Sequence, residues 1–134
     1  MTDRTYVLVD SNIILDLSGN DLQWREWSKT TLGLIEIPFV NSVVFSELCY
    51  FESSPEAVID LLANLDIGYQ DLDKTALYLA SQAYRYYRKR GGIKTSPLPD
   101  FFIGAHAASL GIPILTRDVA RYRSYFPSVE LICP

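Results

Sequence analysis

The sequence has few of the residues on which disulfide-rich and zinc-binding proteins depend. Its 134 residues include two cysteines, Cys49 and Cys133, and a single histidine, His106. Two isolated thiols build no disulfide framework and have no zinc-site spacing, so we expect both to be reduced and packed as small apolar groups. His106 lies among alanines, and we expect it to be a packed or surface residue rather than a general base.

Long apolar runs are also missing. No stretch approaches the roughly 18 residues that a membrane-spanning helix needs, and the apolar run at residues 6–9 ends at Asp10, which makes it too short for the core of a signal peptide. With no membrane segment and no targeting signal visible, we expect a cytoplasmic protein. Repeats and long linkers are absent as well, and 49% of the residues are hydrophobic. Residues 1–134 are therefore predicted to form one globular domain.

Positive charge is scarce in the first part of the chain and concentrated in the last part. The formal net charge of −4 divides into −9 over residues 1–84 and +5 over residues 85–134. The overall sign argues against simple nonspecific binding of nucleic acid. The distribution nevertheless allows a phosphate-bearing partner to approach the basic part, or a basic peptide to approach the acidic part.

Short apolar segments alternate with helical patterns along the chain. Predicted strands cover residues 5–10, 38–41, 67–72, 112–116 and 129–132. Four predicted helices begin after a capping residue: Ser11 or Asn12, Ser42, Ser54 and Asp73. Two more cover residues 22–32 and 99–110. The last of these is apolar nearly all round, so we expect it to be buried. The alternation predicts an α/β fold of three layers, α/β/α, with a mainly parallel central sheet of about five strands.

Four acidic residues fall where such a fold places functional sites. Asp10 closes the first strand and Asp118 follows the fourth, at the carboxyl ends of parallel strands. Asp100 lies in the first turn of the buried helix. Glu47 shares a helix face with Val44 and Phe51, where a carboxylate is costly unless it is paired or binds a metal.

Converging carboxylates repel one another, and a divalent cation relieves that repulsion. Hard oxygen ligands suit Mg²⁺ or Mn²⁺, which polarise phosphoryl oxygens and lower the pKa of water. Three of the acids also have a structural explanation: Asp100 as a helix-dipole partner, Asp118 as a cap of the turn at residues 119–122, and Asp10 as a strand-ending residue. Asp16 is a candidate supporting carboxylate.

The joint pattern resembles the PIN-domain family, and within it the VapC-like toxins of toxin–antitoxin pairs. The matching segments cover essentially the whole chain: residues 7–16 (VLVDSNIILD), 41–48 (NSVVFSEL), 98–107 (LPDFFIGAHA), 114–118 (ILTRD) and 121–127 (RYRSYFP).

The resemblance implies a three-layer domain with Mg²⁺- or Mn²⁺-dependent endoribonuclease activity. The four motif acids correspond to Asp10, Glu47, Asp100 and Asp118, with Asp10 and Asp100 expected as direct metal ligands. The supporting polar residues match Ser11, Asn12 and Thr116. The resemblance further implies a homodimer held inactive by a cognate antitoxin, whose C-terminal segment enters the acidic groove, sometimes with an arginine.

A basic stretch near a helix end is a candidate RNA contact. It consists of Arg85, Arg88, Lys89, Arg90 and Lys94, with tyrosines interleaved. Cations also favour helix C-termini, which explains the stretch without RNA, whereas the functional interpretation is contact with an RNA backbone, with base stacking on the tyrosines. Arg117 can touch a phosphate or pair with an acid.

The leading hypothesis from the sequence is metal-dependent hydrolysis of RNA. A phosphatase with Asp10 as aspartyl nucleophile is a second hypothesis, although its usual partner acid two residues later is replaced by Asn12. A third is a non-catalytic PIN-like module that binds RNA or protein.

Overall fold

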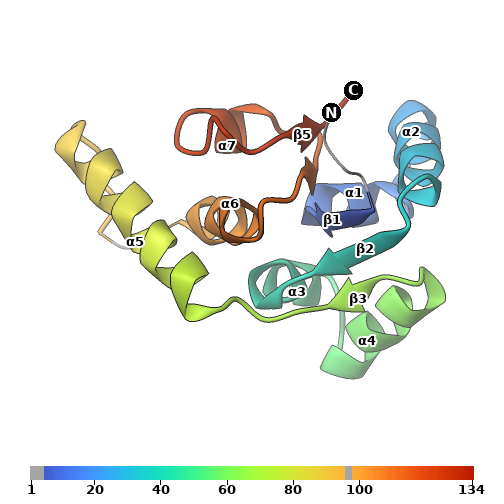
Figure 1. Ribbon diagram of the computed structural model, residues 1–134. Helices are drawn as coiled ribbons and strands as arrows, with labels where there is room; N and C mark the ends of the chain where they lie inside the picture. The colour runs from blue at the N-terminus through green and yellow to red at the C-terminus, as the bar shows by residue number, and fades with distance from the viewer. Residues whose placement is uncertain (1–4, 96–97) are drawn as a thin grey trace.

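The computed structural model describes residues 5–95 and 98–134, which form a five-stranded sheet with seven helices (Figure 1). In chain order the elements are β1 (Tyr6–Val9), α1 (Ser11–Asp16), α2 (Leu22–Gly33), β2 (Ile37–Val40), α3 (Ser42–Cys49), α4 (Pro55–Asn64), β3 (Gly68–Tyr69), α5 (Lys74–Lys89), α6 (Pro99–Leu110), β4 (Ile114–Leu115), α7 (Ala120–Arg123) and β5 (Leu131–Ile132). The predicted α/β/α class is confirmed.

The strand order explains where a site can form. The sheet runs β3-β2-β1-β4-β5 and every neighbouring pair is parallel, with Leu8 in register with both Phe39 and Ile114. From β1 the chain moves outward through β2 to β3, then crosses back to β4 on the other side of β1. The order therefore reverses between β1 and β4, and ligands of open α/β sheets bind at the carboxyl ends of strands at such a reversal.

Four of the five strands are shorter than the sequence predicts, and β2 has the expected length but begins and ends one residue earlier. The strand expected over residues 67–72 pairs only at Gly68–Tyr69, because its one neighbour, β2, ends at Val40, which is the partner of Tyr69. Asp10 and Thr116 likewise follow β1 and β4 rather than belonging to them. This leaves both side chains free to turn toward the site.

The main core surrounds the sheet and includes residues of the helices packed on it. Val7, Leu8 and Val9 are fully buried, as the continuous apolar run predicts. Helix α6 is buried as expected, and its Ile103 and Ala107 pack into the main core. Helix α4 packs Val58 and Leu62 into this core, whereas Ile59 is 54% exposed.

Helix α5 packs along α6 at the outside of the molecule (Figure 1). A second cluster joins them to the chain after α7 through the buried residues Ala80, Phe101, Ala105 and Phe126. Gly104 of α6 has no space for a Cβ, because the Phe126 ring lies against its backbone. The segment that carries α7 is thereby fixed against α6. Within the described ranges, no helix is both long and apolar enough to cross a membrane.

Candidate active site

Asp10 is fully buried at the carboxyl end of β1, and its side chain caps α1. Its Oδ1 accepts a 2.8 Å hydrogen bond from the backbone N–H of Ser11. The expected caps, Ser11 and Asn12, were wrong, because α1 already begins at Ser11 and the preceding carboxylate reaches its free N–H. The side chains of Ser11 and Asn12 are therefore available for other contacts.

Three further donors hold Oδ2 of Asp10. The Tyr122 hydroxyl donates at 2.7 Å, the Thr116 hydroxyl at 2.9 Å and the Asn12 amide at 3.3 Å. The Ser11 hydroxyl donates instead to Glu47 at 3.2 Å. The structure thus places all three predicted polar residues, Ser11, Asn12 and Thr116, against the acids.

Glu47 lies on α3 with 27% of its side chain exposed. Its Oε2 accepts a 2.8 Å hydrogen bond from the Arg121 guanidinium, and another nitrogen of the same group donates to Oδ1 of Asp10 at 2.9 Å. The apolar helix face therefore carries Glu47 with a charged partner, which offsets the cost of its partial burial.

Asp100 and Asp118 complete the neighbourhood. Burial raises the pKa of Asp100, and the nearby charges of Asp118 and Glu47 raise it further, while a backbone hydrogen bond and Arg121 lower it. Asp118 is exposed; its N–H donates to the Thr116 hydroxyl, and its Oδ1 accepts from the N–H of Arg121 at 3.2 Å. Asp118 thus does cap the following turn, as one interpretation of the sequence held.

Arg121 is the residue that the sequence did not mark as functional, and it relates to all four acids. It forms ion pairs with Asp10 and Glu47. Its backbone N–H donates to Asp118, and its charge acts on Asp100. Burial lowers its pKa, but the carboxylates outweigh burial and leave the pKa raised, so it stays protonated. Its position three residues after Asp118 was the one available signal, because that spacing places two side chains on one side of a helical turn.

Asp16 and Arg117 form a separate pair. Arg117 donates to both carboxylate oxygens of Asp16 at 2.6 and 2.8 Å, and its guanidinium carbon lies 4.5 Å from the centre of the Trp24 ring. Ser28 donates to the same carboxylate. Of the two roles expected for Arg117, the structure shows pairing with an acid. Its backbone N–H also donates to Asn12, which ties the pair to the site.

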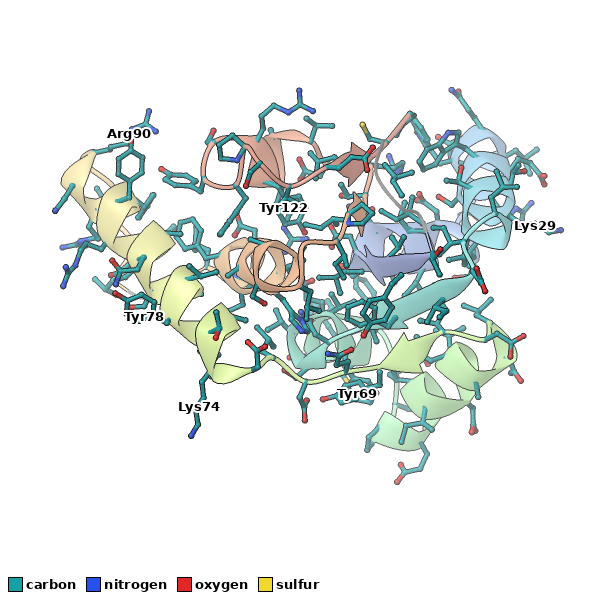
Figure 2. The ribbon with its side chains drawn as sticks, viewed as in Figure 1. Lys29, Tyr69, Lys74, Tyr78, Arg90 and Tyr122 are labelled. Atoms are coloured by element: carbon teal, nitrogen blue, oxygen red, sulfur yellow. The ribbon has the colours of Figure 1, made fainter. Side chains whose placement is uncertain are left out.

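The basic stretch lies at the exposed end of α5. The Arg88 guanidinium and the Tyr84 hydroxyl both donate to the carbonyl of Lys94, which fixes the turn after the helix. Arg90 lies at the tip of the helix (Figure 2), with its guanidinium carbon 5.4 Å from the centre of the Tyr86 ring and 6.0 Å from that of Tyr125. Arg85, Arg88, Lys89, Arg90 and Lys94 are all exposed.

His106 is fully buried, which agrees with the expectation of a packed histidine. Asn41, rather than the expected Ser42, caps α3 by accepting from the N–H of Val44, so its amide nitrogen is free to donate to Nδ1 of His106 at 3.1 Å. This assigns the proton of the neutral ring to Nε2, which has no hydrogen-bond partner among the described residues. Burial lowers the pKa of His106.

The family model of the PIN domain matches residues 7–125, and the chain belongs to that family. Its fold is similar to that of solved VapBC complexes. The similar chain in VapBC2 of Rickettsia felis, bound to a promoter DNA fragment, is 14% identical with a TM-score of 0.70, covering 96% of this chain and 98% of that one. For VapBC-1 of nontypeable Haemophilus influenzae the identity is 16%, the TM-score 0.70 and the coverage 96% and 97%. For DNA-bound VapBC of Salmonella typhimurium the identity is 18% and the TM-score 0.68, and the match covers 99% of this chain and 98% of that one. No curated protein matches the sequence.

Proposed function

We propose that this chain is a Mg²⁺- or Mn²⁺-dependent endoribonuclease that hydrolyses RNA phosphodiester bonds. The observation that carries the proposal is the gathering of Asp10, Glu47, Asp100 and Asp118 near Arg121 at the strand reversal. The Arg121 guanidinium pairs with Asp10 and Glu47, its backbone N–H donates to Asp118, and its charge acts on Asp100. Gathering the acids has an electrostatic cost, since the charges of Asp118 and Glu47 raise the pKa of Asp100, and a partly buried guanidinium balances the charges of Asp10 and Glu47.

The donor set fits a hard divalent cation. The acids offer carboxylate oxygens, which Mg²⁺ and Mn²⁺ prefer. Asp10 and Glu47 already bind one positive charge, the guanidinium of Arg121. Asp10 and Asp100 would be the main ligands, with Glu47 and Asp118 beside them. When bound, the cation supplies Lewis-acid polarisation of a phosphoryl oxygen and a lowered water pKa.

The protein itself orients the acids. Ser11, Asn12, Thr116 and Tyr122 donate hydrogen bonds to Asp10 or Glu47 and hold these carboxylates in fixed rotamers. Supporting contacts of this kind set the geometry of metal ligands and of catalytic groups. The same contacts disfavour an aspartyl-phosphatase role, because both oxygens of Asp10 are occupied by donors rather than exposed for attack.

RNA is supported as substrate by the exposed end of α5. Its arginines and lysines suit a phosphate backbone, and Tyr86 and Tyr125 offer rings on which bases can stack. Tyr125 lies just after α7, four residues from Arg121, which pairs with the acids. Helix α7 therefore connects the exposed end of α5 to the acids. One RNA strand that touches both places would bring a phosphodiester to the carboxylates.

We further propose that the chain is the toxin of a toxin–antitoxin pair, binds a cognate antitoxin protein and forms a homodimer. The support is the fold: a similar structure from Klebsiella pneumoniae is described as a toxin–antitoxin complex, and VapBC-5 of Mycobacterium tuberculosis as a member of such systems. Coexpression with the protein encoded by a neighbouring small gene tests the pairing, and a stable copurifying complex is the expected result.

The test of the activity is direct. Purified, antitoxin-free protein is incubated with structured RNA and with DNA of the same sequence, in Mn²⁺, in Mg²⁺ and in chelator. Cleavage of RNA that needs the metal supports the proposal. RNA or protein binding without cleavage, together with no calorimetric Mn²⁺ binding, would favour the non-catalytic module. A phospho-aspartate trapped at Asp10 would favour the phosphatase.

A further inference from the structure

One guanidinium lies between the two carboxylates that the proposed function assigns to a metal. Arg121 donates through one nitrogen to Oδ1 of Asp10 at 2.9 Å and through another to Oε2 of Glu47 at 2.8 Å. The Arg121 side chain is 18% exposed, and the Asp10 side chain is fully buried. The guanidinium thus forms a charge-assisted bridge at a partly buried site, where ion pairs are stronger than at the surface.

The bridge uses the oxygen lone pairs that a metal would need. Oδ1 of Asp10 accepts two hydrogen bonds, from Ser11 N–H and from Arg121, while Oδ2 accepts three. A carboxylate oxygen has about two lone-pair sites. Of these five donors, four belong to the backbone, to short side chains or to the buried Tyr122. Only Arg121 is on a long flexible chain that can leave without moving an element of the fold.

The acids lie near one another, but in this arrangement they do not converge on one point. Over residues 5–95 and 98–134, no three potential metal ligands of the His, Cys, Asp or Glu type lie close enough to hold one ion. Mg²⁺ requires oxygens at about 2.0–2.1 Å, closer than the two N···O distances of the guanidinium bridge. The guanidinium fills the space between Asp10 and Glu47, so it and a metal ion cannot bind both carboxylates together.

We propose that Arg121 is an internal counter-ion that closes the metal site, and that a divalent cation binds by displacing its guanidinium from Asp10 and Glu47. The inference rests on the proposed function, since it takes these acids as metal ligands. Arg121 stabilises the metal-free fold and weakens metal binding by the same contacts. The protein therefore binds its metal less tightly than its carboxylates alone would allow.

The experiment is calorimetric titration of Mn²⁺, without RNA, into the full chain and its variants. Arg121→Gln removes the competing charge, and Arg121→Lys keeps a charge but cannot donate to both carboxylates as a planar fork does. The matched control is Arg123→Gln, which removes the same charge from an exposed position on α7. We expect Arg121→Gln to lower the Mn²⁺ dissociation constant by about tenfold, equivalent to about 1.4 kcal/mol, with Arg123→Gln close to wild type and Arg121→Lys in between.

Each outcome decides the matter. If wild type binds Mn²⁺ and Arg121→Gln binds it equally or more weakly, the inference is wrong while the proposed metal site stands. If no variant binds Mn²⁺, both the metal site and the inference fail.

A measurement on wild type covers the case in which Arg121→Gln does not fold. The Arg121 side-chain N–H signals, assigned by their loss in Arg121→Lys, are followed by nitrogen-15 NMR during a Mg²⁺ titration. We expect them to move toward the positions of exposed arginines as metal binds. If the Arg121 signals stay in place while other signals of the protein report Mg²⁺ binding, the displacement of Arg121 is wrong.

Discussion

The Tyr122 hydroxyl donates a 2.7 Å hydrogen bond to Oδ2 of Asp10, and both side chains are fully buried. Burial raises the pKa of Tyr122 and the charge of Asp10 raises it further, so the hydroxyl is protonated and donates at neutral pH. The contact joins α7 to the end of β1 and fixes the carboxylate that the remaining site residues surround.

Removal of this hydroxyl should destabilise the protein. Tyr122→Phe takes one donor from a buried carboxylate, and hydrogen bonds to charged groups contribute about 1.5–3 kcal/mol. Urea denaturation of Tyr122→Phe should show a loss of this size. Tyr86→Phe, at an exposed ring, is the control and should unfold like wild type. Equal midpoints for Tyr122→Phe and Tyr86→Phe would show that the bond contributes nothing.

Asp10→Asn should destabilise the metal-free protein strongly. The substitution leaves the Arg121 charge with Glu47 alone and turns an amide toward donors that need an acceptor. Removing one partner of a buried ion pair costs about 3–5 kcal/mol. Thermal unfolding in chelator measures the effect, and an unchanged midpoint would mean that the contacts of Asp10 are not formed in solution.

Asp100→Asn should act in the opposite direction. Burial and the charges of Asp118 and Glu47 raise the pKa of Asp100 above its ordinary value of 3.8. A carboxyl whose pKa is raised by folding contributes stability that is fully present below its pKa in the unfolded chain. This stability is lost as the pH rises through its pKa in the folded protein, so the ionised group is a net cost at neutral pH. We expect Asp100→Asn to unfold at a higher temperature than wild type at pH 7 without metal, because the buried charge is gone. A loss of stability at pH 7 would contradict the assignment.

Parallel strands explain why Asp10 and Asp118 were recognisable from the sequence. A buried apolar run that ends in a polar residue places that residue at the carboxyl edge of the sheet, so no tertiary information is required. Glu47 was recognisable because a carboxylate on an apolar helix face needs a partner.

Arg121 and Tyr122 were not recognisable in the same way. Their shared partner, Asp10, lies 111 and 112 residues earlier in the chain, and α7 is only four residues long, too short for a periodic pattern. A surface arginine in a basic segment looks the same in sequence as one buried against two acids. The choice of Asp10 over Ser11 as cap was missed for a local reason, since both side chains can accept from a helix N–H.

The stability of the protein should fall below neutral pH because of His106. Its Nδ1 accepts from Asn41, and burial lowers its pKa below the ordinary value of 6.5. A histidine whose pKa is lowered by folding contributes stability that is present above its pKa in the unfolded chain. This stability is lost as the pH falls toward its pKa in the folded protein. His106→Gln should flatten the dependence of the melting temperature below pH 6.5. Because His106 is the only histidine, its NMR titration is unambiguous, and a midpoint at or above 6.5 would contradict the burial argument.

Gly104→Ala should disturb the site from a distance. A Cβ at this position collides with the Phe126 ring, which must move and shift the segment that carries α7. Overpacking of this kind costs about 1–3 kcal/mol. Gly33→Ala, at a helical position where a Cβ meets nothing, is the matched control and should not destabilise. If both variants unfold alike, the contact between α6 and the Phe126 ring does not constrain the fold.

The rate of Mn²⁺-dependent cleavage of an end-labelled RNA by Asp100→Asn, measured beside wild type and Asp60→Asn, tests the central claim most directly. Asp100→Asn is expected to fold at least as well as wild type, so a lost rate reports on the site rather than on stability. Asp60 is an exposed acid of α4 and controls for the change of charge. The account predicts that Asp60→Asn cleaves at the wild-type rate and that Asp100→Asn is slower by about a hundredfold or more, about 2.7 kcal/mol or more in the barrier. Cleavage by Asp100→Asn at the wild-type rate would contradict it.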